Sequence, residues 1–171
     1  MPLICPHCSH ENLSGNETCE LCHQDLRHEV LPKPTTGLQK RIISETMSHL
    51  NPSSPILVSP ETSALEVIQK MQERGIGSAL IVDEKGMLVG IFTDRDILQK
   101  IGFEQSDLQE LPIYTLMTLN PVSLTEDDSI AYALNKMSVG GFRHIPIVRN
   151  GKPVGLITVK DLFHYLCRPT A

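Results

Sequence analysis

The chain has 171 residues, of which 40% are hydrophobic and only 4% aromatic, and its formal net charge is −5. This acidic balance weighs against a duplex nucleic-acid partner, which needs several lysine or arginine contacts to phosphate. No stretch reaches the roughly 18 apolar residues that cross a bilayer, and the sequence starts without a secretion signal. We therefore expect a cytoplasmic protein with an aliphatic core of strands and helices.

Four of the five cysteines form two Cys-x-x-Cys pairs near the start of the sequence: Cys5, Cys8, Cys19 and Cys22. Two such pairs complete a tetrahedral thiolate shell. The segment has too few apolar side chains to fold alone, so metal must supply most of its stability, about 10–16 kcal/mol in zinc-finger peptides. We predict a zinc ribbon over residues 1–30, with a short β-hairpin between the pairs whose turn uses Asn12, Ser14, Gly15 and Asn16.

Other interpretations of the cysteine pairs stay open. A redox dithiol would need a single pair on a βαβ scaffold. Iron is the second alternative, because the pairs also resemble rubredoxin knuckles, although rubredoxins place glycine where this chain has Ser9 and His23. We expect the histidines at 7, 10, 23 and 28 to stay outside a shell that four thiolates complete. Because the segment is acidic, a structural or protein-contacting role is favoured over phosphate binding.

A linker and a leading helix follow the predicted ribbon. Residues 31–37 contain two prolines and a glycine, which disfavour regular structure. From residue 38 to residue 50 the apolar positions approximate one helical face. A second break at residues 51–55 again contains two prolines. The rest of the chain therefore begins near residue 55.

Residues after this point repeat themselves, which indicates two copies of one fold. At an offset of 66 residues, Met71 aligns with Met137 and Gly75 with Gly141; after one deletion in a turn, the segment 89–97 aligns with 154–162. Each copy is predicted to run strand, helix, strand, strand, helix, with hairpin turns at residues 83–86 and 149–151. Serine caps at Ser63 and Ser129 are expected to start the first helix of each copy, and Gly75 and its counterpart Gly141 to end it. The fold class is mixed α/β. We divide it into a first repeat with its leading helix at 38–107 and a second repeat at 108–168.

Several motifs within the repeats resemble a pair of cystathionine-β-synthase (CBS) domains, also called a Bateman module. They are residues 90–96 (Gly-Ile-Phe-Thr-Asp-Arg-Asp), residues 155–161 (Gly-Leu-Ile-Thr-Val-Lys-Asp), residues 143–148 (Arg-His-Ile-Pro-Ile-Val), and the segments at 46–47 and 116–121. The resemblance covers residues 41–168. It implies a pseudo-twofold disc with two clefts that bind AMP, ADP, ATP or S-adenosylmethionine, and a homodimer of two modules.

The repeated Thr-x-x-Asp motif explains how these residues could hold a nucleotide. Threonine and aspartate three apart share the first turn of a helix, so the carboxylate can accept hydrogen bonds from both ribose hydroxyls. Phosphate would lie near the helix N-terminus and a basic side chain of the same turn, and the resemblance adds an Arg-His pair facing phosphate. The predicted site residues are Thr93, Arg95, Asp96, Arg143, His144, Thr158, Lys160 and Asp161.

Adenine needs an apolar slot, for which the sequence offers Ile56, Val58, Val122 and Leu124. The alternative is that each Thr-x-x-Asp motif is only a helix cap. The two copies also differ, because Gly77 and Ser78 stand where the second repeat has Arg143 and His144. We therefore expect the half-site of Thr158 and Asp161 to hold the tighter or more phosphorylated ligand.

Three function classes follow from these motifs. The first is a regulatory adenine-nucleotide sensor in signal transduction that modulates an unknown protein partner. The second is a nucleic-acid-associated regulator that uses the ribbon. The third is an enzyme, for which His164 and Cys167, three residues apart on the predicted terminal helix, are candidates for a base and a nucleophile; these two are better explained by packing and helix-end charge. We predict the first class and no catalytic activity.

Overall fold

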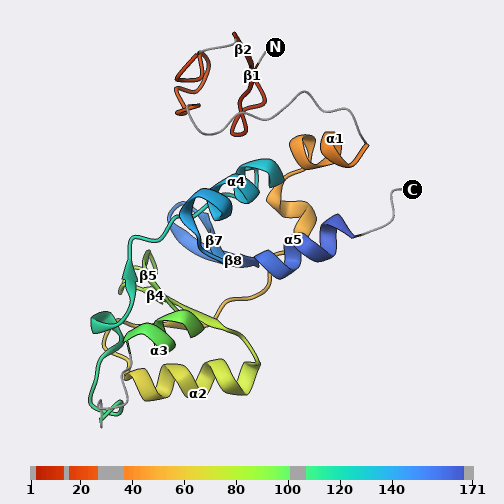
Figure 1. The fold of residues 1–171 in the computed structure, drawn as a ribbon. Coiled ribbons are helices and arrows are strands. Elements are labelled where there is room, and N and C mark those ends of the chain that lie inside the picture. Colours follow the sequence, from red (N-terminus) through yellow and green to blue (C-terminus); the bar gives the residue numbers. More distant parts are fainter. Residues whose placement is uncertain (1–2, 14–15, 27–36, 101–106, 168–171) are drawn as a thin grey trace. The chain divides into compact units, whose positions relative to one another are not determined.

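The computed structural model describes residues 3–13, 16–26, 37–100 and 107–167 (Figure 1). Residues 31–36 of the predicted linker lie outside this range. The chain folds into two compact units, neither of which is continuous in sequence. The first contains residues 1–52, 124–145 and 157–171, and the second contains residues 53–123 and 146–156.

The second unit is built on a four-stranded sheet of order β3-β4-β5-β6. Strand β3 (Leu57–Val58) is parallel to β4 (Ser78–Val82), whereas β5 (Leu88–Thr93) is antiparallel to β4 and β6 (Thr118–Leu119) is antiparallel to β5. The predicted turn at residues 83–86 connects β4 to β5. Asp83 accepts hydrogen bonds there from the backbone of Lys85 and Met87, and Gly86 has a φ of 76°. The local turn chemistry therefore fixes this hairpin.

Two helices pack on this sheet, α2 (Ala64–Arg74) against β4 and α3 (Asp94–Lys100) against β5, and both lie below these strands in Figure 1. As predicted, the Ser63 side chain accepts from the Glu66 amide, and Gly75 ends α2 with a φ of 61°. The core between sheet and helices is aliphatic apart from one aromatic ring. It consists of Ile56, Val58, Ala64, Val67, Met71, Ala79, Ile81, Phe92, Ile113 and Leu116.

The first unit begins with a small ribbon that contains β1 (Leu3–Ile4) and β2 (Glu11–Asn12). The described strand pairings do not include the predicted hairpin between the two cysteine pairs, and its turn residues Ser14 and Gly15 lie outside the described residues. Strands β1 and β2 pair antiparallel on either side of the first cysteine pair, and a bridge between Thr18 and Asp25 encloses the second pair. Each pair closes its own loop, because the hydrogen bonds that its cysteine amides form are local.

The predicted continuous helix over residues 38–50 is wrong. Helix α1 (Gly37–Ser44) ends before Glu45, and a separate 3-10 helix covers Met47–Leu50. At the break, the Met47 amide donates to the Asp128 carbonyl and the Ile130 amide donates to the Glu45 carbonyl. These tertiary hydrogen bonds replace those that a continuous helix would make across residues 45–47.

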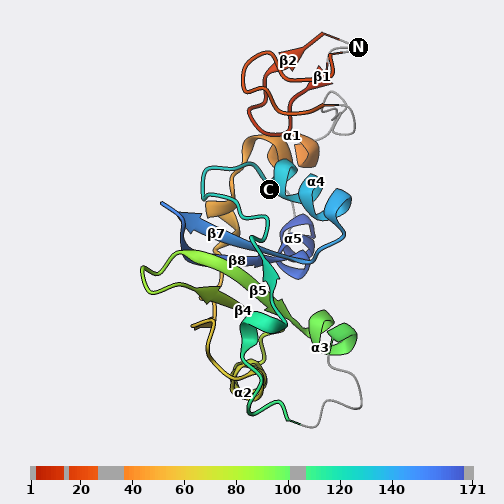
Figure 2. The same ribbon diagram turned by 90° about the vertical axis from the view of Figure 1, so that its left-hand side faces the viewer.

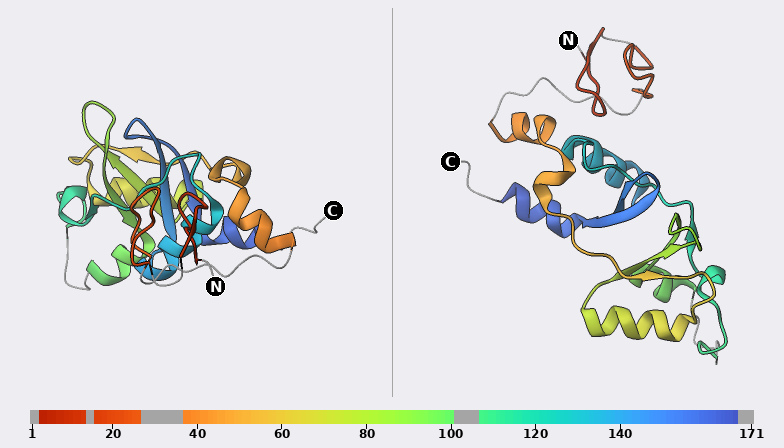
Figure 3. Two further views of the ribbon diagram at one scale, coloured as in Figure 1. Left: turned by 90° about the horizontal axis from the view of Figure 1, so that it is seen from above. Right: turned by 180° about the vertical axis from the view of Figure 1, so that it is seen from behind.

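The rest of the first unit consists of α4 (Ile130–Gly140) and α5 (Val159–Leu166), with α1 against α4 as Figures 1 and 3 show. Ser129 caps α4 and Gly141 ends it with a φ of 66°, as predicted. Strands β7 (His144–Arg149) and β8 (Lys152–Thr158) pair as a hairpin (Figure 2), and residues 146–156 of this hairpin count toward the second unit. Asn150 and Gly151 both have positive φ, at 52° and 76°, which confirms the predicted turn.

The second copy departs from the predicted element order at its first strand. Residues 121–123 form no strand and Leu124 forms a single bridge only. A parallel pairing as short as that of β3 has few hydrogen bonds, so losing one reduces the strand to a bridge. Within the described residues, no helix combines the length and apolar character needed to cross a membrane.

Internal symmetry is clearest in the segments that lead into each repeat. Thr46 forms a β-bridge with Ser129, and Pro112 forms a β-bridge with Ser63. Thr46 and Pro112 are 66 residues apart, as are Ser63 and Ser129, so the two bridges are equivalent in the two copies. Each leader therefore pairs with the cap of the other copy's first helix. Because the leaders are exchanged, the compact units cross the boundaries of the sequence repeats.

Candidate functional site

The four cysteines of the ribbon form a compact sulfur cluster. All four Sγ atoms lie within 4.8 Å of one another, with 3.6 Å between Cys5 and Cys22 and 3.5 Å between Cys8 and Cys19. A tetrahedral ion with metal–sulfur bonds of about 2.3 Å separates its sulfurs by roughly 3.8 Å. Among the described histidines, none belongs to this cluster. The donor set therefore fits a tetrahedral thiophilic ion such as Zn²⁺ or iron.

The two cysteine loops have the same backbone geometry. The Cys5 amide donates to the His10 carbonyl at 2.9 Å, and the Cys19 amide donates to the Gln24 carbonyl at 2.7 Å. Ser9 and His23, which follow the pairs, each have a φ of 58°. These are the positions where rubredoxin knuckles place glycine, so the chain adopts the knuckle conformation without that residue.

Hydrogen bonds prepare one thiol of the cluster for deprotonation. Burial alone would raise the pKa of Cys19, but the amides of Cys22 and Leu21 and the Asn12 side chain lower this pKa to about 6. Burial raises the pKa of Cys5 and of Cys8. An ion bound by all four sulfurs must displace the remaining protons, so metal affinity increases with pH.

The ribbon has almost no apolar core of its own. Among the described residues, the apolar cluster of the ribbon consists of Cys5, Cys19 and Leu26, whereas Leu13 and Leu21 are 72% and 63% exposed. A cluster of sulfurs and one leucine is too small to hold this segment folded. That metal binding supplies the stability of the ribbon stays a prediction.

Within the first unit, the first cysteine loop contacts the N-terminus of α4. The Ser129 hydroxyl donates to the Pro6 carbonyl at 2.7 Å, and the rings of His7 and Tyr132 meet edge-on at 4.8 Å. Tyr132 also donates to Gln24 at 3.3 Å. No spacing in the sequence indicates these contacts, which bring together residues more than a hundred positions apart.

The Thr158 half-site, defined as Thr158, Asp161, Arg143, His144 and Lys160, lies at the start of α5 in the first unit. Asp161 Oδ2 accepts from the Thr158 amide and hydroxyl, both at 2.7 Å, and Thr158 caps the helix. No hydrogen bond to Asp161 Oδ1 is present within the described part of the chain. The Arg143 carbonyl accepts from the Val159 amide at 2.9 Å, which places the Arg143-His144 pair beside this turn.

A buried contact of Tyr165 holds the C-terminal end of α5 in place. Tyr165, 2% exposed, donates to Glu45 at 2.5 Å, and the Arg41 guanidinium lies 4.8 Å from the Tyr165 ring centre. Burial and the Glu45 carboxylate raise the pKa of Tyr165 to about 12, and the hydrogen bond from Tyr165 lowers the pKa of Glu45. Tyr165 is therefore neutral and committed to Glu45, four residues beyond Asp161.

The Thr93 half-site, defined as Thr93, Asp96 and Arg95, lies at the start of α3 in the second unit. Asp96 Oδ2 accepts from the Thr93 amide at 2.9 Å and from the Thr93 hydroxyl at 2.7 Å, as in the other copy. Here, however, Asp96 Oδ1 is paired with the Lys100 ammonium at 2.6 Å. Lys100 was not among the predicted residues, although its position four residues after Asp96 could have indicated an ion pair.

Both Thr-x-x-Asp motifs thus form the local cap that the alternative interpretation predicted. A third copy of the motif has the same geometry, because Asp128 Oδ2 accepts from the Thr125 amide at 2.6 Å and from its hydroxyl at 2.9 Å. The cap by itself is therefore no sign of a ligand. What distinguishes the half-sites is the second oxygen of each carboxylate.

The predicted adenine-contacting residues divide between the units. Ile56 and Val58 are buried in the core of the second unit, and Val122, in the same unit, is 44% exposed. Leu124 is buried in the first unit. The structure thus places Leu124 in the unit of the Thr158 half-site, and Ile56, Val58 and Val122 in that of the Thr93 half-site.

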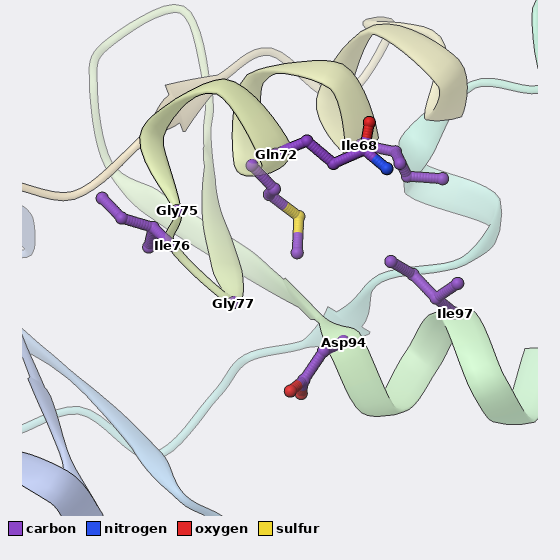
Figure 4. A pocket seen from close by; sticks show the side chains of 8 residues that line it. Ile68, Gln72, Gly75, Ile76, Gly77, Asp94 and Ile97 are labelled. Carbon is purple, nitrogen blue, oxygen red and sulfur yellow. The ribbon is translucent and has the colours of Figure 1, made fainter.

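An open groove of about 330 Å³ lies between α2 and α3 of the second unit (Figure 4). Ile68, Met71 and Ile97 give it an apolar lining, and Asp94 lies at its edge. None of the predicted nucleotide-contacting residues lines it. The groove shares no lining residue with the Thr93 half-site, although Asp94, which lies next to Thr93 in the chain, lines it.

These features define the chain as a duplicated α/β module with a four-cysteine cluster near its start. The CBS domain family model matches residues 43–102 and 113–168. The chain therefore belongs to the CBS domain family, as its motifs predicted, and contains two CBS repeats. The described residues also confirm the predicted mixed α/β fold.

Among curated proteins, the chain is 36% identical over 124 residues to the CBS domain-containing protein CBSCBSPB5 of Arabidopsis thaliana. The match covers 72% of this chain but only 23% of that protein, so the chain spans about a quarter of the length of this relative. It is also 32% identical over 117 residues to an uncharacterized 17.7 kDa protein of Acidianus ambivalens, covering 68% of this chain and 70% of that protein.

Among solved structures, the CBS domain pair of protein MJ0100, in complex with 5′-methylthioadenosine and S-adenosyl-L-methionine, is 26% identical with a TM-score of 0.63. The match covers 70% of this chain and 94% of that one. The CBS domain protein PAE2072 of Pyrobaculum aerophilum, complexed with AMP, has the same fold at 24% identity and a TM-score of 0.62, covering 68% of this chain and 89% of that one.

Proposed function

We propose that this protein is a regulatory sensor that binds an adenine nucleotide or S-adenosylmethionine and changes its affinity for a protein partner. The observation that carries the proposal is the Thr158 half-site. Asp161 keeps one carboxylate oxygen uncommitted, at the N-terminus of a helix and beside an arginine, a histidine and a lysine. That is a set of groups suited to a ribose hydroxyl and a phosphate.

Relatives support the ligand class. A CBS pair of the same fold holds 5′-methylthioadenosine and S-adenosyl-L-methionine, which share an adenosine. The predicted mode of ribose recognition uses only adenosine, so it does not choose among AMP, ADP, ATP and S-adenosylmethionine. We propose that the protein acts through a partner rather than as an enzyme. A coupling of about 1–3 kcal/mol would change partner affinity five- to 150-fold.

A thermal-unfolding panel tests the ligand class. We expect one or more of AMP, ADP, ATP and S-adenosylmethionine to raise the melting temperature, because a ligand at 100 times its dissociation constant adds about 2.7 kcal/mol of apparent stability. Inosine monophosphate, which keeps the ribose and phosphate but changes the base edge, serves as the control. If none of the four adenine compounds shifts the transition at millimolar concentration, the proposed ligand class is wrong.

We also propose that the ribbon holds one Zn²⁺ through Cys5, Cys8, Cys19 and Cys22, with a structural or protein-contacting role. The sulfur separations and the lack of an apolar core support a structural ion. The same four thiolates would accept iron, so elemental analysis of the purified chain decides between the metals. Bound zinc would supply the four-coordinate closure of two loops and no catalytic step.

A homodimer is the proposed assembly, supported by apolar side chains that both repeats leave exposed. Leu98 on α3 is 85% exposed and Phe163 on α5 is 62% exposed, and these residues occupy the same position in the two copies. Large apolar side chains that recur at equivalent exposed positions indicate a protein contact. The groove between α2 and α3 lies on the helix that carries Leu98.

We expect Leu98→Asp to convert the dimer into a monomer in light scattering, because it introduces a charge into the proposed interface. Val139→Asp is the matched control, since Val139 is 65% exposed but aligns with the polar residue Glu73. A monomeric wild type, or a dimer that survives both Leu98→Asp and Phe163→Asp, would remove these helices from the interface.

A further inference from the structure

Lys100 makes the two half-sites chemically different. Its ammonium lies 2.6 Å from Asp96 Oδ1 and donates to the Leu116 carbonyl at 2.7 Å. The ion pair therefore joins α3 to the segment that precedes β6. Within the described residues, Asp161 forms no such ion pair. The residue four positions after Asp161 is Tyr165, which donates a hydrogen bond to Glu45 instead.

The carboxylate of Asp96 is thereby occupied on both oxygens. Oδ2 accepts two hydrogen bonds from Thr93 and Oδ1 accepts one from Lys100, and the residue is only 7% exposed. A ribose diol recognised by one carboxylate needs free acceptor positions that face solvent. For Asp96 to bind a ribose, the Lys100 ammonium would have to move away. The buried carboxylate would then lose its counter-charge.

The residue that would complete the first half-site is also unsuited to phosphate. Ser78 aligns with His144, but Ser78 is 1% exposed and its hydroxyl has no hydrogen-bond partner in the structure. Ser78 pairs with Thr93 in the register of β4 and β5, so it lies at the base of this half-site. A buried hydroxyl cannot replace the partly exposed imidazole that the second copy provides.

We infer that Lys100 closes the Thr93 half-site, so that each chain binds a single nucleotide, at the Thr158 half-site. This inference rests on the proposed function, because it assigns that ligand to one of two related junctions. In this arrangement Asp96, Lys100 and the Leu116 carbonyl form a structural link within the second unit. Lys100 is the residue that sets the stoichiometry.

Isothermal titration of the full chain with AMP tests this assignment. We expect one equivalent for wild type, one for Asp96→Ala and none for Asp161→Ala. Lys100→Met keeps the aliphatic stem but removes the ammonium. It should restore a second equivalent by strengthening AMP binding at the Thr93 half-site at least about tenfold. The double variant Lys100→Met with Asp161→Ala should bind one equivalent, at the opened half-site.

Two controls distinguish loss of the Lys100–Asp96 ion pair from a general loss of positive charge or of folding. Lys100→Arg keeps a cation four residues after Asp96 and should still bind one equivalent. Lys70→Met removes an exposed lysine that pairs with Glu66 at the same four-residue spacing and 2.7 Å, and should leave the stoichiometry at one. Thermal unfolding without ligand shows whether Lys100→Met is folded; if it is not, Lys100→Gln takes its place.

Other outcomes are equally informative. If wild type binds two equivalents and Asp96→Ala removes one, the link does not block the first half-site, although the protein still binds nucleotide. A folded Lys100→Met chain that stays at one equivalent contradicts the inference in the same way. If AMP binds to none of these proteins, and the thermal panel is also negative, the proposed function itself fails and the inference fails with it.

Discussion

We expect chelation of the proposed metal ion to unfold the ribbon and to leave the CBS repeats folded, which is the largest effect that we predict. The ribbon buries a single leucine with its sulfurs in the described residues, so its apolar core contributes little stability besides that of an ion. Metal binding contributes about 10–16 kcal/mol in zinc-finger peptides of similar size. Proton–nitrogen NMR of the full chain would show it as a loss of dispersed signals from the ribbon alone.

Substitution of single cysteines should reproduce the effect of chelation. Cys8→Ser removes one of four ligands, and the purified protein should contain less than one zinc per chain by elemental analysis. Cys167→Ser is the control, because Cys167 is exposed and lies outside the sulfur cluster. A ribbon whose signals persist unchanged in excess chelator would show that the fold does not depend on metal.

Metal loss should also reach the N-terminus of α4. The Ser129 hydroxyl is buried and donates to the Pro6 carbonyl within the first cysteine loop. When that loop unfolds, Ser129 loses this partner, and a hydrogen bond of this kind contributes about 1 kcal/mol. The first unit should therefore become slightly less stable on chelation. The change should be smaller in Ser129→Ala, which lacks the hydrogen bond from the start.

Asp161→Ala should weaken adenine-nucleotide binding by about 100-fold or more. Two hydrogen bonds from ribose to a carboxylate contribute roughly 1.5–3 kcal/mol each, and 1.4 kcal/mol corresponds to a factor of ten. Titration calorimetry with the ligand that the thermal panel identifies gives the two dissociation constants. The substitution also removes the Asp161 side chain from the capping box of α5, although the Thr158 cap remains, and unfolding in the absence of ligand measures this loss of stability separately.

The third Thr-x-x-Asp motif provides a matched control for this substitution. Asp128 makes the same two hydrogen bonds to Thr125 that Asp161 makes to Thr158. Asp128→Ala therefore removes the same pair of local hydrogen bonds in a turn outside the half-site, and we expect nucleotide affinity to change less than threefold. Equal losses in both variants would mean that the cap, and no contact with ribose, explains the effect of Asp161→Ala.

Local features of this protein were determined by its sequence. The cysteine spacing places four sulfurs within reach of one ion, and the caps at Ser63 and Ser129 start the helices predicted for them. Asn150 and Gly151 form the predicted turn. The two CBS repeats were recognisable from aligned motifs. Each of these features depends on residues that are near one another in the chain, so the pattern of side chains alone is sufficient.

Tertiary structure decided the features that join distant segments. The leading helix stops at Ser44 because Glu45 and Met47 bond to residues near Ser129, and Tyr165 is committed to Glu45 across 120 positions. Tertiary contacts also distinguish the two carboxylates. Lys100 pairs with Asp96 and donates to the Leu116 carbonyl, which holds the ammonium in place. Such contacts join residues that are far apart in the sequence. The pattern of residues within one segment does not specify which distant segment packs against it.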